Sequence, residues 1–150
     1  MNANLSRRSE SWQALSRVAY TGAIMPVIKG IGIDSIQIAR VARVYAEYGE
    51  KFLSRILTDA EREYALRYAD PVPRIAGRFA AKEACMKALG TGWGYGVRWR
   101  DIEVRRGPAG APVAHLSGQA ERRMQELGGS HVHVTITHTD DHAMAMIVIE

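Results

Sequence analysis

The chain has 150 residues, of which 47% are hydrophobic and 24% are charged, and its formal net charge is +4. This length favours one domain with a substantial core, and the charge is too mild to indicate a nucleic-acid-binding protein. No apolar run approaches the roughly 18 residues that a membrane-spanning helix needs. The single cysteine, Cys85, excludes an internal disulfide and is expected to be a packing residue, which fits a reducing, cytoplasmic location.

Residues 1–24 differ in composition from the rest, because they are rich in serine and arginine and carry only a weak amphipathic stretch. Three interpretations remain open. The segment is a disordered extension, a translation of codons upstream of a true start at Met25, or an organelle-targeting peptide. Few arginines and no evident cleavage signal disfavour the last of these. We therefore expect residues 25–150 to form the folded domain.

Hydrophobic periodicity together with turn and capping residues predicts the order β-α-α-α-β-β-α-β-β, which indicates an α+β domain. The elements are a strand at 27–33, helices at 34–48, 58–68 and 73–89, strands at 101–106 and 112–117, a helix at 118–127, and strands at 131–138 and 143–149. Asp34 and Ser35 are expected to supply the N-cap of the first helix. Thr58 and Glu61 have the spacing of a capping box. A loop rich in glycine and tryptophan occupies 90–99.

Two charged residues fall where the longest helix should be apolar. At about 100° per residue, Lys82 lies inside the apolar stripe of that helix and Glu83 lies at its edge. An unpaired charge in an apolar interior costs several kcal/mol, so these charges are expected to meet each other, a metal or a charged ligand. The helix ends at Gly90-Thr91-Gly92, a flexible backbone that can approach a ligand closely.

Asp34 stands at the end of a glycine-containing strand, where it is either a helix N-cap or a metal ligand. Asp34 and Glu83 are candidates for a pair of carboxylates that hold Mg²⁺ together with phosphate oxygens and water. Glu83 and Lys87 are spaced i,i+4, so a surface ion pair is the alternative. Arg78 and Lys82 have the same spacing, which places a basic ridge beside the carboxylate and suits a metal–diphosphate ligand.

The strand at 131–138 alternates, which places His131 and His133 on one face and His138 on the other, among apolar residues. This parity argues against a zinc site within the strand, although His142 could join from the next strand. His138 is either a packed core histidine or, near a phosphate, a hydrogen-bond donor or proton shuttle.

Arg40 and Arg43 are spaced i,i+3 on the first predicted helix and alternate with apolar residues. They form either a solvated face or a docking surface for an acidic partner helix.

These segments together resemble the holo-acyl-carrier-protein synthases, the small bacterial class of 4′-phosphopantetheinyl transferases. The matching segments cover about residues 27–149 in the family's order and spacing: Gly30–Asp34 with Arg40, Phe52–Thr58 with Glu61, Arg78–Gly92, Asp101–Val104 and His133–His138. The combination of Gly-x-Gly-x-Asp with Phe-Ala-Ala-Lys-Glu-Ala-x-x-Lys-Ala-x-Gly-Thr-Gly is highly specific. The family usually begins shortly before Gly-x-Gly, which favours Met25 as the start. Thr135 stands where many members have serine, and the loop from Trp93 to Trp99 is individual to this chain.

The resemblance implies an antiparallel sheet packed against a long central helix, with one domain per chain. It implies Mg²⁺-dependent transfer of 4′-phosphopantetheine from coenzyme A to a serine of apo-acyl carrier protein, a step of fatty acid biosynthesis that releases adenosine 3′,5′-bisphosphate. It also implies a homotrimer with active sites at the subunit interfaces. Two alternatives remain: the same transfer to a carrier domain of a polyketide or peptide synthase, or a non-catalytic coenzyme A-binding module.

The resemblance also implies roles for individual residues. Asp34 and Glu83 match the metal ligands, and Arg40, with Arg43 beside it, matches the contact to the carrier protein. The residues expected near coenzyme A are Arg78, Lys82, Lys87, Gly90, Thr91, Gly92 and His133. Catalysis is expected to involve Glu83, Lys82 and His138, with Lys82 offsetting charge on the leaving oxygens. The proton acceptor is expected to be a carboxylate reached through a metal-bound water or, as a second choice, His138.

Overall fold

The computed structural model describes residues 27–150, so the expectations for residues 1–24 lie outside the described part of the chain. The elements are β1 (Gly30–Gln37), α2 (Ile38–Tyr48), α3 (Glu50–Ile56), α4 (Asp59–Leu66), α5 (Val72–Ala88), β2 (Ile102–Arg106), β3 (Pro112–Leu116), α6 (Gly118–Glu126), β4 (Val132–His138) and β5 (His142–Ile149), with two short 3-10 turns at Trp99–Asp101 and Pro108–Gly110. Helices and antiparallel strands share one core, which confirms the predicted α+β class. None of the helices in 27–150 is long and apolar enough to cross a membrane.

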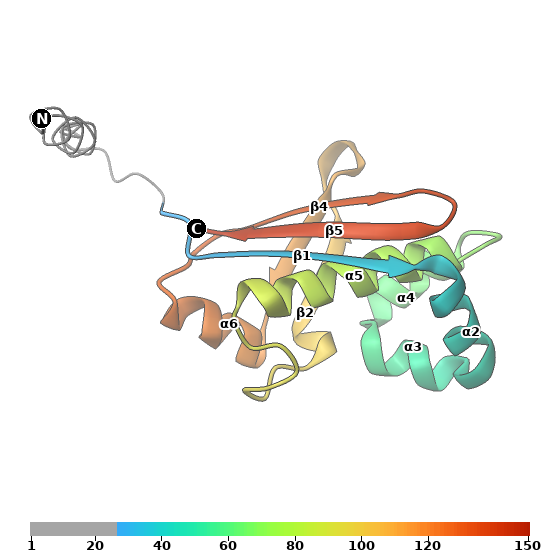
Figure 1. The fold of residues 1–150 in the computed structure, drawn as a ribbon, viewed down its shortest axis with the longest axis horizontal. Coiled ribbons are helices and arrows are strands. Elements are labelled where there is room, and N and C mark those ends of the chain that lie inside the picture. The colour runs from blue at the N-terminus through green and yellow to red at the C-terminus, as the bar shows by residue number, and fades with distance from the viewer. Residues whose placement is uncertain (1–26) are drawn as a thin grey trace, which may run out of the picture.

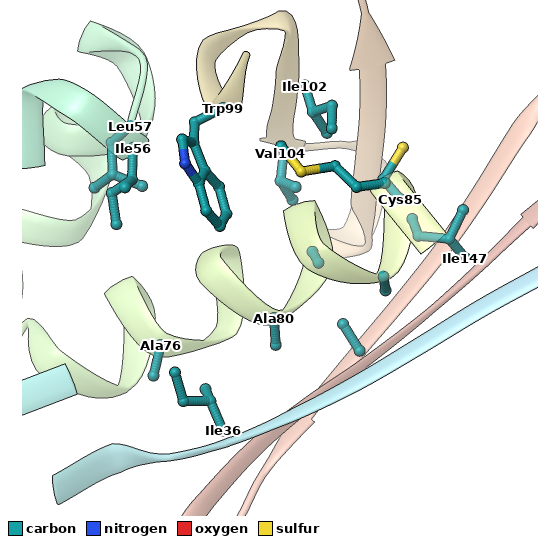
Figure 2. Close-up of a cluster of buried hydrophobic side chains, with 14 of the residues drawn as sticks. Ile36, Ile56, Leu57, Ala76, Ala80, Cys85, Trp99, Ile102, Val104 and Ile147 are labelled. Atoms are coloured by element: carbon teal, nitrogen blue, oxygen red, sulfur yellow. The ribbon is translucent and has the colours of Figure 1, made fainter. Parts of the chain in front are cut away.

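Helix α5 is the centre of the fold. Strands β1, β5 and β4 form an antiparallel sheet in that order, and α5 lies along one face of it, with α2, α3 and α4 grouped near one end (Figure 1). Trp99 and the β2 residues Ile102 and Val104 lie on the side of α5 opposite β1 (Figure 2). Eleven of the 17 residues of α5 are buried, as expected for a helix that is enclosed over most of its surface. This enclosure explains why a charge on α5 must find a partner.

Two glycines allow β1 to contact the backbone of α5. A Cβ atom added to Gly30 would collide with the Ala88 carbonyl oxygen, and one added to Gly32 would collide with the Ala84 carbonyl oxygen. Glycine is required here because it alone has no Cβ. The close approach of strand and helix carries Asp34, two residues after Gly32, to the side of α5.

The structure corrects two predictions of secondary structure. Asp34 and Ser35 are not a helix N-cap, because β1 continues to Gln37, which pairs with His142 of β5. The backbone N–H and C=O groups of Asp34 and Ser35 therefore belong to the ladder between β1 and β5, and not to a helix. The structure also contains α3, a helix of seven residues that was not predicted. It begins after Gly49 and buries Leu53 and Ile56.

Several local predictions are confirmed. The capping box is present: the Thr58 side chain accepts from the Glu61 N–H, and the Glu61 side chain accepts from the Thr58 N–H. Cys85 is buried, and burial raises the pKa of its thiol to about 12, so it is a packing residue. The alternation of β4 also holds, since Val132 and Ile136 are half-buried while His133 is exposed.

The face of the three-stranded sheet that points away from α5 is apolar along β1 and β5. Ile31 and Ile33 are 59% and 55% exposed, and Met144 is 40% exposed. Ile31 lies opposite Val148 and Ile33 lies opposite Met146, so these side chains form adjacent rows on one surface. A contiguous apolar surface of this kind commonly marks a contact with another molecule.

Candidate active site

Asp34 and Glu83 lie in the same pocket, which we call the carboxylate pocket. It has a volume of about 200 Å³, and its lining residues are Asp34, Ser35, Ile36, Arg40, Phe79, Glu83 and Trp93. Asp34 comes from β1, Arg40 from α2 and Glu83 from α5, so three elements contribute one charged group each. The structure thus brings together two carboxylates that are distant in the sequence.

Glu83 is the electrostatically unsatisfied group of this pocket. Its Oε1 atom is buried and has no hydrogen-bond partner in residues 27–150. Burial and the nearby Asp34 charge raise the pKa of Glu83, whereas Lys87 and Trp93 lower it. A cation placed between the two carboxylates would relieve both the burial of Glu83 and its repulsion by Asp34.

The donor set of the carboxylate pocket suits Mg²⁺. The described residues contain no group of three or more His, Cys, Asp and Glu side chains that could hold a metal ion. The acidic side chains that line the carboxylate pocket are those of Asp34 and Glu83, which are hard oxygen ligands. Mg²⁺ is commonly held by one or two carboxylates, with phosphate oxygens and water completing its octahedron. The residues present therefore fit a magnesium site that is completed by a phosphorylated substrate.

Lys87 lies beside this pocket and pairs with Asp34. The Lys87 Nζ atom is 2.8 Å from Asp34 Oδ1 and 2.9 Å from the Ile33 carbonyl oxygen. The alternative interpretation, an ion pair between Lys87 and Glu83, is not found among the described residues, because β1 brings Asp34 within reach of Lys87. The Lys87 side chain is half exposed, so it can also meet a ligand phosphate.

Lys82 does not reach the carboxylate pocket. Its side chain is 0% exposed, and its Nζ atom donates to Glu61 Oε2 at 2.8 Å, to the Trp99 carbonyl oxygen at 2.9 Å and to the Ile102 carbonyl oxygen. An ammonium group has three N–H donors, so none remains for a phosphate. Burial lowers the pKa of Lys82, and the Glu61 carboxylate opposes that shift. The expectation that Lys82 faces the diphosphate is therefore corrected. In the structure, Lys82 connects α5 to Glu61 and to the Trp99–Ile102 segment by an ion pair and hydrogen bonds.

Glu61 is the partner that the sequence interpretation missed. Besides Lys82, its carboxylate accepts from the backbone N–H groups of Thr58 and Val104. The sequence interpretation assigned Glu61 only to the capping box with Thr58, so it did not search for a further partner of its carboxylate. The hydrogen bond to Val104 and the ion pair to Lys82 join residues that are far apart in the chain, and no local spacing signals them.

A second pocket, which we call the basic pocket, contains Arg78 and His138. It has a volume of about 280 Å³, and the residues used below are Tyr64, Arg74, Arg78, Arg106 and His138. The guanidinium carbon of Arg78 lies 4.1 Å from the centre of the Tyr64 ring. The buried Nε atom of Arg78 has no hydrogen-bond partner in the described range, and burial lowers the pKa of this arginine.

The charge of the basic pocket is unbalanced. In residues 27–150, Arg74, Arg78 and Arg106 form no ion pair with a carboxylate. Unpaired guanidinium groups that converge on one cavity are suited to bind an anion, and above all a phosphate. His138, at the end of β4, faces this pocket rather than the carboxylate pocket of its own chain.

The remaining predicted residues lie outside both pockets. His133 is exposed, and its Nε2 atom is 2.8 Å from Glu150 Oε1. Thr91 is buried, and its hydroxyl donates to the Met86 carbonyl oxygen at the end of α5. Gly90 and Gly92 adopt positive φ values of 68° and 50°, which allow the chain to turn from α5 toward Trp93.

Arg40 and Arg43 are both exposed on α2, but they stand differently toward the site. Arg40 lines the carboxylate pocket, and Arg43 does not. Sequence reasoning missed Phe79 and Trp93 of the carboxylate pocket and Arg74 of the basic pocket. The i,i+4 spacing of Arg74 and Arg78 was a signal that could have found the last of these.

Comparison with known proteins agrees with this geometry. Residues 30–147 match the profile of the 4′-phosphopantetheinyl transferase superfamily. The chain therefore belongs to this superfamily.

Within the superfamily, the chain is 47% identical over 124 residues to the holo-[acyl-carrier-protein] synthase of Nitratidesulfovibrio vulgaris, which covers 83% of this chain and 99% of that protein. It is similar to the crystal structure of the Neisseria meningitidis holo-[acyl-carrier-protein] synthase, with a TM-score of 0.76, 34% identity, and coverage of 83% of this chain and 99% of the other. The Helicobacter pylori synthase, solved in complex with coenzyme A, matches with a TM-score of 0.71, 34% identity, and coverage of 80% and 99%. The chain is thus a member of the holo-[acyl-carrier-protein] synthase family.

Proposed function

We propose that this chain transfers 4′-phosphopantetheine from coenzyme A to a serine hydroxyl of apo-acyl carrier protein, with adenosine 3′,5′-bisphosphate as the second product. The observation that carries the proposal is the carboxylate pocket, in which Glu83 has a buried oxygen without a partner beside Asp34. A family relative has been solved with coenzyme A, which supports coenzyme A as the donor.

Asp34 and Glu83 are the proposed ligands of Mg²⁺. When bound there, the ion would neutralise charge on the diphosphate of coenzyme A. Lys87, half exposed and bonded to Asp34, lies where its ammonium can shift to a phosphate oxygen. Phosphoryl transfer depends mainly on positioning and charge neutralisation, and these three side chains can supply both.

The proton of the serine hydroxyl would pass, directly or through water, to a carboxylate of the carboxylate pocket. His138 was the second choice for this role. It lines the basic pocket, where an imidazole N–H would instead donate to a phosphate. We therefore propose that Arg78 and His138 bind the phosphorylated adenosine end of coenzyme A.

The two pockets suggest how a homotrimer would assemble the site. Arg78 and Glu83 project from α5 about 140° apart, and the pockets around them share no lining residue in 27–150. One coenzyme A molecule could reach both kinds of pocket if a neighbouring subunit supplied the basic one. The exposed apolar face around Ile31 and Ile33 offers a surface for such a neighbour. We propose a homotrimer on these grounds, and a cytoplasmic location because the single cysteine, Cys85, is a buried free thiol.

Arg40 and Arg43 are the proposed contacts to the carrier protein. Both are exposed on α2 and form no ion pair among the described residues, so they are available to an acidic helix. Arg40 also lines the carboxylate pocket, which would place the acceptor serine beside the metal ligands.

A single assay tests this function. Purified chain is incubated with apo-acyl carrier protein, coenzyme A and Mg²⁺, and the carrier is weighed by mass spectrometry. We expect the mass to rise by one phosphopantetheine group, and the rise to be lost when Mg²⁺ is chelated. An unchanged carrier mass would leave the non-catalytic coenzyme A-binding module as the better interpretation.

The identity of the acceptor is tested separately. A panel of apo-carriers from fatty acid, polyketide and peptide synthases, assayed at equal concentration, ranks the acceptors by rate. We expect the fatty acid carrier to react fastest. A faster reaction with a polyketide or peptide synthase domain would favour the alternative assignment.

A further inference from the structure

Two tyrosines and two arginines form a stacked set beside the basic pocket. Tyr64 belongs to α4, Tyr68 follows the end of that helix, and Arg74 and Arg78 belong to α5. The guanidinium carbon of Arg74 lies 4.4 Å from the centre of the Tyr68 ring, and that of Arg78 lies 4.1 Å from the centre of the Tyr64 ring. The two rings meet edge to face with their centres 5.4 Å apart, and the Tyr68 hydroxyl donates to the Tyr64 hydroxyl at 3.1 Å. We call this set the Arg–Tyr stack.

Few polar contacts hold the Arg78 guanidinium group in place. Its Nη1 atom donates to the Arg74 carbonyl oxygen at 3.4 Å, which is long for a hydrogen bond, and its buried Nε atom has no partner in residues 27–150. Arg98 and Arg100 differ, because each lies within 3.3 Å of a carboxylate. The ring of Tyr64 is therefore the contact best placed to fix the position of the Arg78 guanidinium.

An aromatic partner has a chemical consequence for Arg78. A carboxylate in the same place would neutralise the guanidinium charge and occupy its N–H groups. A ring attracts the cation through its face and leaves the N–H groups at the guanidinium edge unoccupied. Arg78 thus keeps its charge and its donors while the ring restrains it. The Tyr64 ring is itself restrained, because its hydroxyl accepts from Tyr68 and the Tyr68 ring packs against Arg74.

Coenzyme A carries two kinds of phosphate, a diphosphate and a phosphate monoester on the ribose of its adenosine end. The diphosphate is the group proposed to lie at Asp34 and Glu83. The monoester is therefore the group left for a pocket of unpaired arginines. A phosphate monoester carries about 1.5 to 2 negative charges at pH 7 and has three acceptor oxygens, which suit bidentate contact with a guanidinium group.

We propose that Tyr64 is a positioning residue for Arg78, supported by Tyr68, and that this positioning gives the chain a preference for coenzyme A over 3′-dephospho-coenzyme A. Tyr64 acts through Arg78 and not by contact with the phosphate. This inference rests on the proposed function, because the adenosine end of coenzyme A must lie in the basic pocket.

The preference is measured as the ratio of two dissociation constants, obtained by calorimetry with Mg²⁺ for coenzyme A and for 3′-dephospho-coenzyme A. Tyr64→Leu removes the ring. It should weaken coenzyme A binding about three- to tenfold, the cost of immobilising one long side chain on binding, and leave the dephospho form unaffected. Tyr64→Phe keeps the ring and should retain the wild-type ratio. A residue needed only for folding would not change the affinity for one ligand alone.

Tyr95 offers a matched control. Its ring centre lies 5.6 Å from the guanidinium carbon of Arg123, and it does not line the basic pocket. Tyr95→Leu removes a tyrosine ring from an arginine elsewhere and should leave the ratio unchanged.

A further variant covers the case in which Tyr64→Leu does not fold. Tyr68→Leu removes the hydrogen bond that restrains Tyr64 but keeps the ring over Arg78. It should lower the ratio about two- to threefold, since the Tyr64 ring is then held less firmly.

The outcomes separate this inference from the proposed function. A ratio that falls in Tyr64→Leu and is retained in Tyr64→Phe supports the positioning role, as does a fall in Tyr68→Leu if Tyr64→Leu does not fold. A wild-type ratio in the folded leucine variants of the stack, equal weakening of both ligands, or a ratio lost equally in Tyr64→Phe overturns it. A wild-type chain that binds both ligands equally also overturns it and leaves the transfer of phosphopantetheine standing, whereas failure to bind coenzyme A overturns both.

Discussion

Lys82 and Glu83 are neighbours on α5, but the regions that surround them differ in one respect. Around Lys82, all three ammonium donors have protein acceptors, and its counter-ion Glu61 is itself bonded to two backbone N–H groups. Around Glu83, a buried oxygen has no partner in residues 27–150, and the Asp34 carboxylate repels it. The comparison teaches that burial of a charge does not by itself indicate function. A charge whose bonds are complete holds the fold together, and a charge with an unused atom points to a ligand.

The largest effect on stability is expected on the Lys82 side of this comparison. Lys82→Met keeps most of the side-chain volume but leaves the Glu61 carboxylate buried without its counter-ion. Breaking a buried pair in this way costs about 3–5 kcal/mol, which urea unfolding would measure. Adding Glu61→Gln should recover part of the loss. A Lys82→Met variant of normal stability that has lost coenzyme A affinity would show that Lys82 faces the ligand after all.

The largest effect on activity is expected from Glu83→Gln. Removal of the charge should lower Mg²⁺-dependent transfer about 10²- to 10³-fold, because an electrostatic group at the reacting diphosphate is lost. The mass assay on carrier protein measures the loss, and urea unfolding confirms that the fold is intact. Transfer at the wild-type rate would contradict the assignment of Glu83 as a metal ligand.

The same variant should reveal how the raised pKa of Glu83 makes the stability of the protein depend on pH when metal is absent. Burial and Asp34 raise the pKa of Glu83 above its unfolded value, so the folded state holds this proton more tightly than the unfolded chain does. The stability linked to this proton is complete at low pH and is lost as the pH rises through the folded pKa. With a chelator present, Glu83→Gln should therefore gain stability relative to the wild type as the pH rises from about 4 to 7. A constant difference between the two would contradict the raised pKa.

Arg78 is the cationic counterpart of Glu83, since it too has a buried polar atom without a partner among the described residues. Arg78→Ala should weaken binding of adenosine 3′,5′-bisphosphate about tenfold, the expected effect of removing a hydrogen bond from a charged donor. The loss of its contact with Tyr64 should lower stability by only about 1 kcal/mol. Calorimetry and thermal unfolding measure the two effects. Unchanged bisphosphate affinity would remove the basic pocket from the proposed site.

The smallest effect is expected from Arg40, which is exposed and forms no ion pair in the described region. Arg40→Ala should raise KM for the carrier protein about three- to tenfold at low salt, and the effect should diminish as ionic strength rises. Arg122→Ala on α6 is the control for removal of an exposed positive charge. An effect of Arg40→Ala that does not depend on salt would argue against electrostatic docking.

Local patterns were sufficient to predict much of the fold. The long apolar period of α5, the Thr58–Glu61 capping box and the alternation of β4 depend on neighbouring residues, and all three are present. The boundary between β1 and α2 was misplaced, because pairing with β5 overrides the capping tendency of Asp34. Helix α3 was missed because seven residues are too few for a clear period.

The candidate site was predictable in its residues but not in their partners. The sequence indicated that Lys82 and Glu83 needed explanation, and the resemblance paired Glu83 with Asp34. Local spacing could not show that Lys82 forms an ion pair with Glu61, which lies 21 positions earlier, and is therefore not available to a ligand in the carboxylate pocket. It also could not show that His138 and Glu83 lie in different pockets, since this depends on how β4 and α5 pack.

The contact of β1 with α5 has a consequence for how the two carboxylates are spaced. At Gly30 and Gly32 the strand rests on the carbonyl oxygens of the helix, so no side chain lies between the two backbones there. The separation of the two backbones that carry Asp34 and Glu83 is therefore set by main-chain contact, whereas the carboxylates themselves still have side-chain rotamers. A single methyl group added at Gly32 would collide with the Ala84 carbonyl oxygen and push β1, which carries Asp34, away from α5. Substitutions of other residues in the carboxylate pocket can change how these two side chains are oriented, but the approach of β1 to α5 at Gly30 and Gly32 leaves no room for any side chain.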